Sequence, residues 1–107
     1  MKTIMLSIPT EFKLFGTTVQ VIFNNAAMNA IKHYGQFDYS TATITLSTTI
    51  GLTPLADDRI IDTFYHEKVH AILDMMNEGE LSENEKFVDV FAKLLRQSDE
   101  TTKYSNL

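Results

Sequence analysis

The pattern of apolar residues changes its period near Ala56, and this change limits the chain to a fold with separate strand and helix regions. Before Ala56, apolar and polar residues alternate, as in strands with one buried face. After it, apolar residues recur every three to four positions, as in amphipathic helices. The sequence therefore predicts an α+β fold, with a single domain at residues 1–97 and a flexible C-terminal tail at 98–107.

Three stretches of the first half predict strands of a small, mainly antiparallel sheet. They are TIMLSI at 3–8, FKLFGTTVQVIF at 12–23 with a bend at Gly16, and FDYSTATITL at 37–46. Residues 24–35 predict a short helix or turn closed by Gly35. In the third stretch, the candidates for the inward face are Tyr39, Ala42, Ile44 and Leu46.

Two helices are expected in the second half, at residues 56–79 and 81–97. The first has acids in its first turn and a glycine at its end, as helices commonly do. In the second, Ser82 is the expected N-cap and Glu85 stands three residues later, which is the spacing of a capping box. We expect the two helices to pack through their apolar stripes.

Charge and composition exclude several classes of function. The net charge is −5, and the acids gather in the second half: residues 1–56 hold two acids and three bases (+1), whereas 57–107 hold twelve acids and six bases (−6). This balance repels phosphate backbones, so no nucleic acid partner is expected. The chain has no cysteine, which excludes disulfides, thiolate ligands and a cysteine nucleophile. No apolar window suits a signal peptide or a membrane span, which favours the cytoplasm.

The segment YHEKVHAIL at 65–73 contains two of the three histidines. A helix turns about 100° per residue, so His66 and His70 leave the same face about 40° apart. Two imidazoles one turn apart can bind one tetrahedral metal ion. Glu67, about 100° from His66, stands beside the pair, where it can face a water without taking a coordination position. The competing interpretation is that two surface histidines share an amphipathic helix by chance.

The second helix offers a third ligand. Its apolar residues lie between about 240° and 340° when Glu85 is set to 0°. If the apolar stripes of the two helices pack together, Glu85 reaches the shared edge where His66 and His70 stand. Glu83, at about 160°, faces away. We therefore expect Zn²⁺ to be held by His66, His70 and Glu85.

The sequence His66-Glu67-x-x-His70 resembles the motif of zincin metallopeptidases, and Asn84-Glu85-x-x-x-Asp89 resembles the second motif of their gluzincin branch. The small size is similar to that of compact zincin-like proteins of bacteriophages and their bacterial hosts. The resemblance implies that Glu85 is the third zinc ligand and that Asp89 orients His66. It covers about residues 56–97 and places the protein in a bacterial or phage-infected cell.

The resemblance also implies peptide-bond hydrolysis. Zinc would lower the pKa of a water molecule and polarise the substrate carbonyl. Glu67 would act as general base and then as general acid toward the leaving amine. An edge strand beside the active helix would hold an extended peptide, and residues 41–46 are the candidate strand.

Some features depart from the larger peptidases. Only 15 positions separate His70 from Glu85, which leaves little room for a substrate subdomain. His33, Tyr34 and Tyr39 are candidate oxyanion donors, but packing or surface placement is the favoured explanation for them. Asp74 shares the histidine face, either as an acceptor for His70 or as a solvated acid.

Two alternatives to a peptidase stay open. A regulatory or protein-binding module could keep zinc without catalysis, and a metal-free interaction protein would make the histidine face a coincidence. Glu67 favours the peptidase, because a purely structural zinc needs no base at that position.

Overall fold

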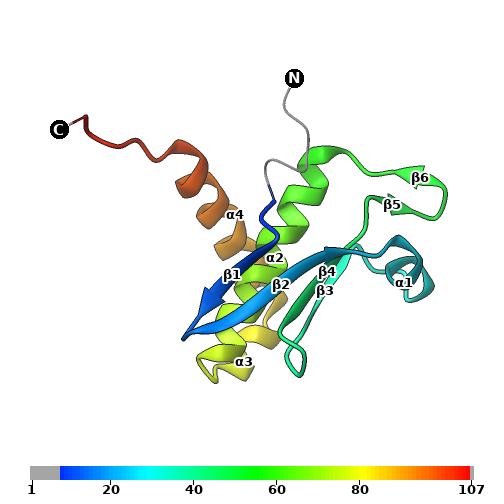
Figure 1. Cartoon of the computed structure of the whole chain (residues 1–107), viewed down its shortest axis with the longest axis horizontal. Helices are drawn as coiled ribbons and strands as arrows, with labels where there is room; N and C mark the ends of the chain where they lie inside the picture. Colours follow the sequence, from blue (N-terminus) through cyan, green and yellow to red (C-terminus); the bar gives the residue numbers. More distant parts are fainter. Residues whose placement is uncertain (1–7, 107) are drawn as a thin grey trace.

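The computed structural model describes residues 8–106, which form an α+β fold with a small, mostly antiparallel sheet (Figure 1). The expected strand at 3–8 lies outside the described residues, apart from its last position. The main sheet contains β1 (Glu11–Leu14), β2 (Thr17–Phe23), β3 (Gly35–Asp38) and β4 (Thr43–Leu46). A small hairpin contains β5 (Thr49–Ile50) and β6 (Thr53–Pro54), and the helices are α1 (Asn25–Ala30), α2 (Asp57–Met75), α3 (Gly79–Glu83) and α4 (Glu85–Thr101).

The strand order is β1-β2-β4-β3, with β2 and β4 parallel and the other two pairs antiparallel. The predicted bend between β1 and β2 is confirmed. Phe15 and Gly16 both have positive φ angles, 50° and 78°, as in the tight hairpin turns that match the twist of strands. The α1 segment and β3 connect β2 to β4, and this long connection allows the parallel pairing.

The single strand predicted at 37–46 is wrong, because these residues form the hairpin of β3 and β4. The break comes from Asp38, whose Oδ1 accepts hydrogen bonds from the backbone N–H and the hydroxyl of Ser40 at 2.9 and 2.7 Å. Ala42 then has a φ of 50° within the turn. Of the four expected inward residues, Ile44 and Leu46 are fully buried, whereas Tyr39 is exposed.

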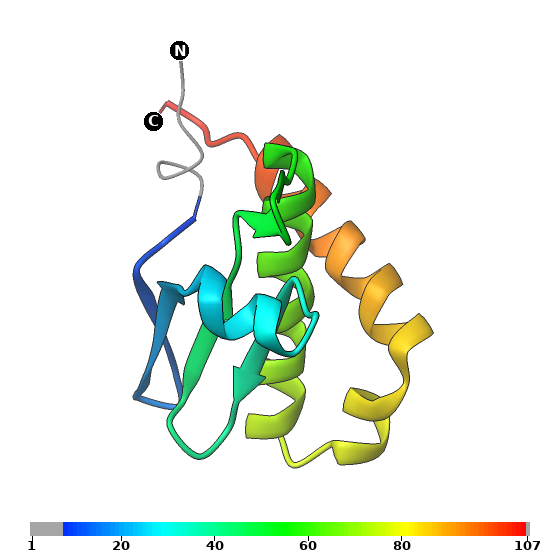
Figure 2. The ribbon, with the colours of Figure 1, turned by 90° about the vertical axis from the view of Figure 1, so that its right-hand side faces the viewer.

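Helix α2 lies between the sheet and α4 (Figure 2) and therefore has two buried faces. Ile60 and Phe64 join the core under the sheet, whereas Val69 and Leu73 pack against Val88 and Ala92 of α4. Only the second of these faces, the one that packs against the other helix, was expected from the sequence. His66 and His70 lie on the part of the α2 surface between these two buried faces, which we call the seam.

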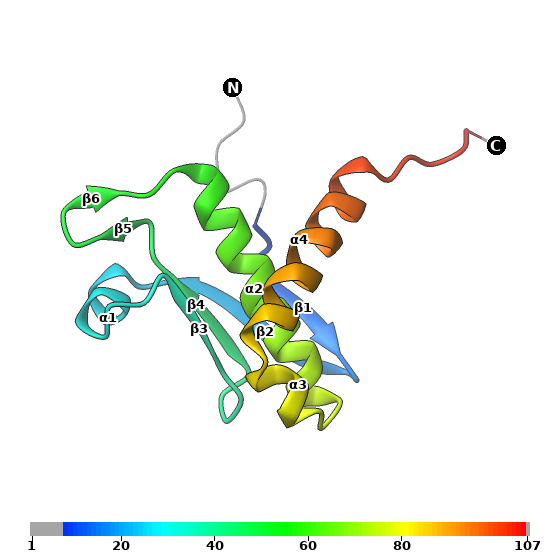
Figure 3. The same ribbon diagram turned by 180° about the vertical axis from the view of Figure 1, so that it is seen from behind.

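The short helix α3 forms the turn between α2 and α4 (Figure 3), and α4 begins at Glu85. The prediction that Ser82 is the N-cap is wrong: Asn84 caps α4 by accepting a hydrogen bond from the Phe87 N–H at 3.1 Å. This start places Glu85 in the first turn of α4, where its side chain can reach α2. Phe91 is one of the apolar residues between 240° and 340° that were expected to pack, but its side chain is half exposed.

Helix α4 continues to Thr101, so the predicted tail is wrong for residues 98–101. Side chains of α2 hold this last turn. The Tyr65 hydroxyl donates to Asp99 at 3.0 Å, and Arg96 donates to Asp62 at 2.8 Å and to Glu100 at 2.9 Å. None of the helices in residues 8–106 has both the length and the apolar character needed to cross a membrane.

Candidate metal centre

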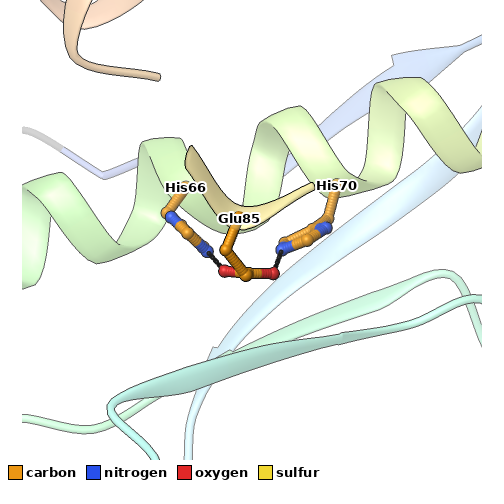
Figure 4. Close-up of side chains that lie close together, drawn as sticks. All are labelled: His66, His70 and Glu85. Carbon is orange, nitrogen blue, oxygen red and sulfur yellow. Dashed lines mark hydrogen bonds and ion pairs between the residues drawn. The ribbon is translucent and has the colours of Figure 1, made fainter. Parts of the chain in front are cut away.

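His66 and His70 of α2 meet Glu85 of α4 at the seam (Figure 4). The Nε2 atoms of His66 and His70 lie 3.1 and 3.3 Å from the two carboxylate oxygens of Glu85. One ligand atom from each residue lies within 4.8 Å of the others. The Glu85 side chain is about two-thirds exposed, so the cluster is open to solvent.

The geometry of this cluster suits a metal ion. With metal–ligand bonds of about 2.0–2.1 Å, ligand atoms at tetrahedral angles stand roughly 3.3 Å apart. The separations of 3.1 and 3.3 Å run to different oxygens of Glu85, so they are not two edges of one tetrahedron, but one atom from each side chain lies within 4.8 Å of the others, within reach of a single ion. Two imidazoles and one carboxylate are also a donor set of catalytic zinc sites, which keep a fourth position open.

The other ring nitrogens of the histidines also lie near polar side chains. His66 Nδ1 lies 3.9 Å from Asp89 Oδ1, which is beyond hydrogen-bond distance, and this oxygen accepts a hydrogen bond from Lys93 at 2.9 Å. His70 Nδ1 lies 2.9 Å from the hydroxyl of Ser82. The contact with Ser82 fixes the orientation of the His70 ring, whose Nε2 faces Glu85.

Ser82 is a site residue that the sequence analysis missed. Its side chain is buried and contacts His70, whereas Asp74 makes no hydrogen bond to His70 in the described structure. Asp74 acts on His70 only through its charge. A serine three residues before a glutamate fits the capping box, so the sequence pattern indicates a helix cap at Ser82 rather than a partner for His70.

We expect Ser82→Ala to lower the zinc affinity about tenfold to a hundredfold, because His70 would lose the partner that orients its ring. Asp74→Asn is the matched comparison and should have a much smaller effect. Competition with a chromophoric chelator measures both affinities. Equal losses in the two variants would show that Ser82 has no special role in the site.

Burial, together with the charge of His66, lowers the pKa of His70. The charges of Glu85 and Asp74 oppose this shift. A low pKa keeps the imidazole neutral at physiological pH, which is the form that binds metals.

Glu67 lies on the side of α2 that faces the sheet, and its side chain is buried. Burial, reinforced by the charge of Glu85, raises the pKa of Glu67 to about 7. A hydrogen bond from the Phe37 backbone N–H acts in the opposite direction. Because a general base works best when its pKa is near the working pH, this environment suits proton transfer at neutral pH.

Strand β3 is the edge of the sheet next to Glu67. The expectation that residues 41–46 form an edge strand is wrong, because β4 pairs with β2 on one side and β3 on the other. The Ser47 N–H donates to the Tyr34 carbonyl at 2.9 Å. Since the backbone direction alternates along an antiparallel strand, Gly35 and Phe37 direct their N–H and C=O groups away from β4.

Gly35 allows β3 to approach α2 closely. A Cβ atom at this position would lie 2.8 Å from Thr63 Cγ2, 3.0 Å from the Thr45 carbonyl and 3.1 Å from Leu46 Cδ2. The glycine therefore positions the outer edge of β3 against the Glu67 side of α2.

We expect Gly35→Ala to lower the free energy of unfolding by about 1–3 kcal/mol, because the added methyl group overpacks the contact. Thr63→Ser should restore part of the loss, since it removes Cγ2 and keeps the hydroxyl that donates to the Arg59 carbonyl at 2.8 Å. Urea denaturation of the two single variants and the double variant measures this coupling. Additive effects would contradict a direct contact.

The three candidate oxyanion donors lie in different places. His33 borders the cavity that contains His66, His70 and Glu67. Tyr34 borders the neighbouring cleft, where its ring stacks against the guanidinium of Arg59 at 5.1 Å. Tyr39 packs against Phe37 at the β3–β4 turn and lines neither cavity. His33 is therefore the candidate nearest to the metal centre.

No protein-family model, curated protein or solved structure matches this chain.

Proposed function

We propose that the chain is a zinc-dependent peptidase whose zinc is held by His66, His70 and Glu85. The observation that supports this most directly is the buried Glu67 beside a three-ligand cluster, with its pKa raised to about 7. A zinc ion that only stabilises a fold needs no base beside it. The cluster is also open to solvent on the Glu85 side, which leaves access for a substrate.

In this mechanism zinc supplies Lewis-acid chemistry, lowering the pKa of water and polarising the carbonyl. Glu67 accepts the proton of the attacking water and transfers it to the nitrogen of the leaving amine. Ser82 holds the imidazole of His70 in position, and the carboxylate of Asp89, 3.9 Å from His66 Nδ1, acts on that ring through its charge. His33, at the border of the cavity, is the proposed donor to the developing oxyanion.

The substrate in this proposal is a peptide that adds to the outer edge of β3. The outward C=O and N–H groups of Gly35 and the C=O group of Phe37 would pair with its backbone. Such pairing holds an extended chain with little dependence on its sequence. It would also bring the chain past Glu67, because the Phe37 N–H hydrogen bonds to that carboxyl group.

The test combines elemental analysis with digestion of a defined peptide mixture, followed by mass spectrometry. We expect one zinc ion per chain and cleavage that stops with a chelator and returns with added zinc. Bound zinc without cleavage of any peptide would instead support the regulatory or protein-binding module. A chain that binds no zinc, even with excess metal, would rule out both.

A further inference from the structure

A second cleft, of about 550 Å³, adjoins the metal centre on the side of the N-terminal half of α2. Its walls come from residues 32–35, from α2 and from α4, and it reaches His66 and Glu67. Three of the nine basic residues of the chain line it, although the net charge is −5. They are Lys32, Arg59 and Lys93.

Two of the three acids that line the cleft are already paired. Asp62 accepts from Arg96 at 2.8 Å, and Asp89 accepts from Lys93 at 2.9 Å. Lys32 and Arg59, by contrast, form no ion pair within residues 8–106. The third acid of the lining, Glu67, is buried and forms no ion pair with either base, so Lys32 and Arg59 stay without a carboxylate partner in the described residues.

Arg59 is oriented for binding. It is seven residues before His66, about 20° away on the helical wheel and about 10 Å along the axis, so both point into the same seam. Its guanidinium lies over the Tyr34 ring, 5.1 Å from the centroid. Stacking of this kind restrains the group while its N–H donors stay free at the rim. The hydrogen bond to Asp89 is the main cause of the raised pKa of Lys93. The positive charge of Arg59 opposes this rise, because it disfavours the protonated form of Lys93.

We propose that this cleft binds a carboxylate of the peptide substrate, with Arg59 as the main recognition residue. The inference rests on the proposed peptidase function and adds a substrate class to it. A carboxylate fits the fork of N–H donors on a guanidinium and would neutralise the unpaired charge. It comes from a Glu or Asp side chain near the scissile bond or from the C-terminus of the peptide.

The probes are N-acetylated alanine octapeptides with a neutral fluorophore, in which one Glu is moved along the chain. Each Glu peptide and its Gln counterpart have an amidated C-terminus. One further Gln peptide keeps a free C-terminal carboxylate. Binding is measured by fluorescence anisotropy on zinc-loaded protein carrying Glu67→Gln, which prevents turnover. Hydrolysis of the same peptides is measured separately with the wild type.

We expect Glu at one position to bind roughly tenfold more tightly than Gln, a preference typical of a charge-assisted hydrogen bond. Arg59→Gln should reduce the ratio to below about threefold, and Arg59→Lys should keep only part of it, because an ammonium group keeps the charge but lacks the fork of donors. Lys13→Gln is the control, because it removes one positive charge from β1, at the sheet edge opposite β3. A preference confined to the free C-terminus would support the same cleft with the chain end as its ligand.

The proposal would be overturned if no position distinguishes Glu from Gln, or if Lys13→Gln lowers the ratio as much as Arg59→Gln does. A preference that depends on Arg59, without hydrolysis by the wild type, would contradict the peptidase function and leave the carboxylate site in place.

Discussion

Replacing Glu67 with glutamine is expected to lower kcat/KM for peptide hydrolysis at least about a thousandfold, while one zinc ion stays bound per chain. Glutamine keeps the size of the side chain and can accept the hydrogen bond from Phe37, but it cannot accept a proton from water. General acid–base catalysis contributes about 10² to 10⁴ in rate, and in this proposal Glu67 performs both proton transfers. Peptide cleavage and elemental analysis on the same samples measure the two quantities.

Glu83→Gln is the matched control for this experiment. Glu83 is an exposed residue of α3, close in sequence to the ligand Glu85, and its substitution makes the same chemical change. Hydrolysis by Glu67→Gln within tenfold of the wild type would show that another group is the base. Loss of zinc in Glu67→Gln would show that Glu67 supports the metal rather than the reaction.

The three proposed ligands could be predicted because their placement depends on local geometry. The spacing of His66 and His70 places them on one helical face, and the pattern of the second helix places Glu85 at the edge of its packing stripe. The structure brings these three side chains together. Neither inference required knowledge of the sheet.

The errors of the sequence analysis concern contacts between elements. The edge position of β3 depends on the parallel pairing of β2 with β4, which the alternation within each strand does not encode. The burial of Glu67 depends on the second apolar face of α2, where Ile60 and Phe64 meet the sheet. The contact of Ser82 with His70 depends on the break at Asn84, and the capping-box pattern favoured a different start of the helix.

The burial of Glu67 has a consequence for stability: we expect Glu67→Gln to stabilise the metal-free protein at pH 8. In the folded chain burial raises the pKa of Glu67 to about 7, compared with 4.5 for a free side chain. Between these values the folded state keeps a proton that the unfolded state has released, so stability falls as the pH rises. Above pH 7 the full penalty applies. One pKa unit corresponds to about 1.4 kcal/mol, so the penalty is roughly 3 kcal/mol.

Urea denaturation in the presence of a chelator measures this effect. Glutamine is neutral at every pH, so Glu67→Gln should be about 2–3 kcal/mol more stable than the wild type at pH 8 and nearly equal to it at pH 4.5. Glu83→Gln, at an exposed position, should show no such dependence on pH. A Glu67→Gln variant that is no more stable than the wild type at pH 8 would contradict a buried, destabilising carboxylate.

Saturating zinc should change the sign or the size of this difference. A nearby dication favours the ionised carboxylate, so it should lower the pKa of Glu67 and relieve the penalty in the wild type. Glutamine has no charge for the metal to stabilise. At pH 8 the stability advantage of Glu67→Gln should therefore shrink or reverse when zinc replaces the chelator. An advantage that zinc leaves unchanged would mean that the metal binds too far from Glu67 for this residue to serve as its base.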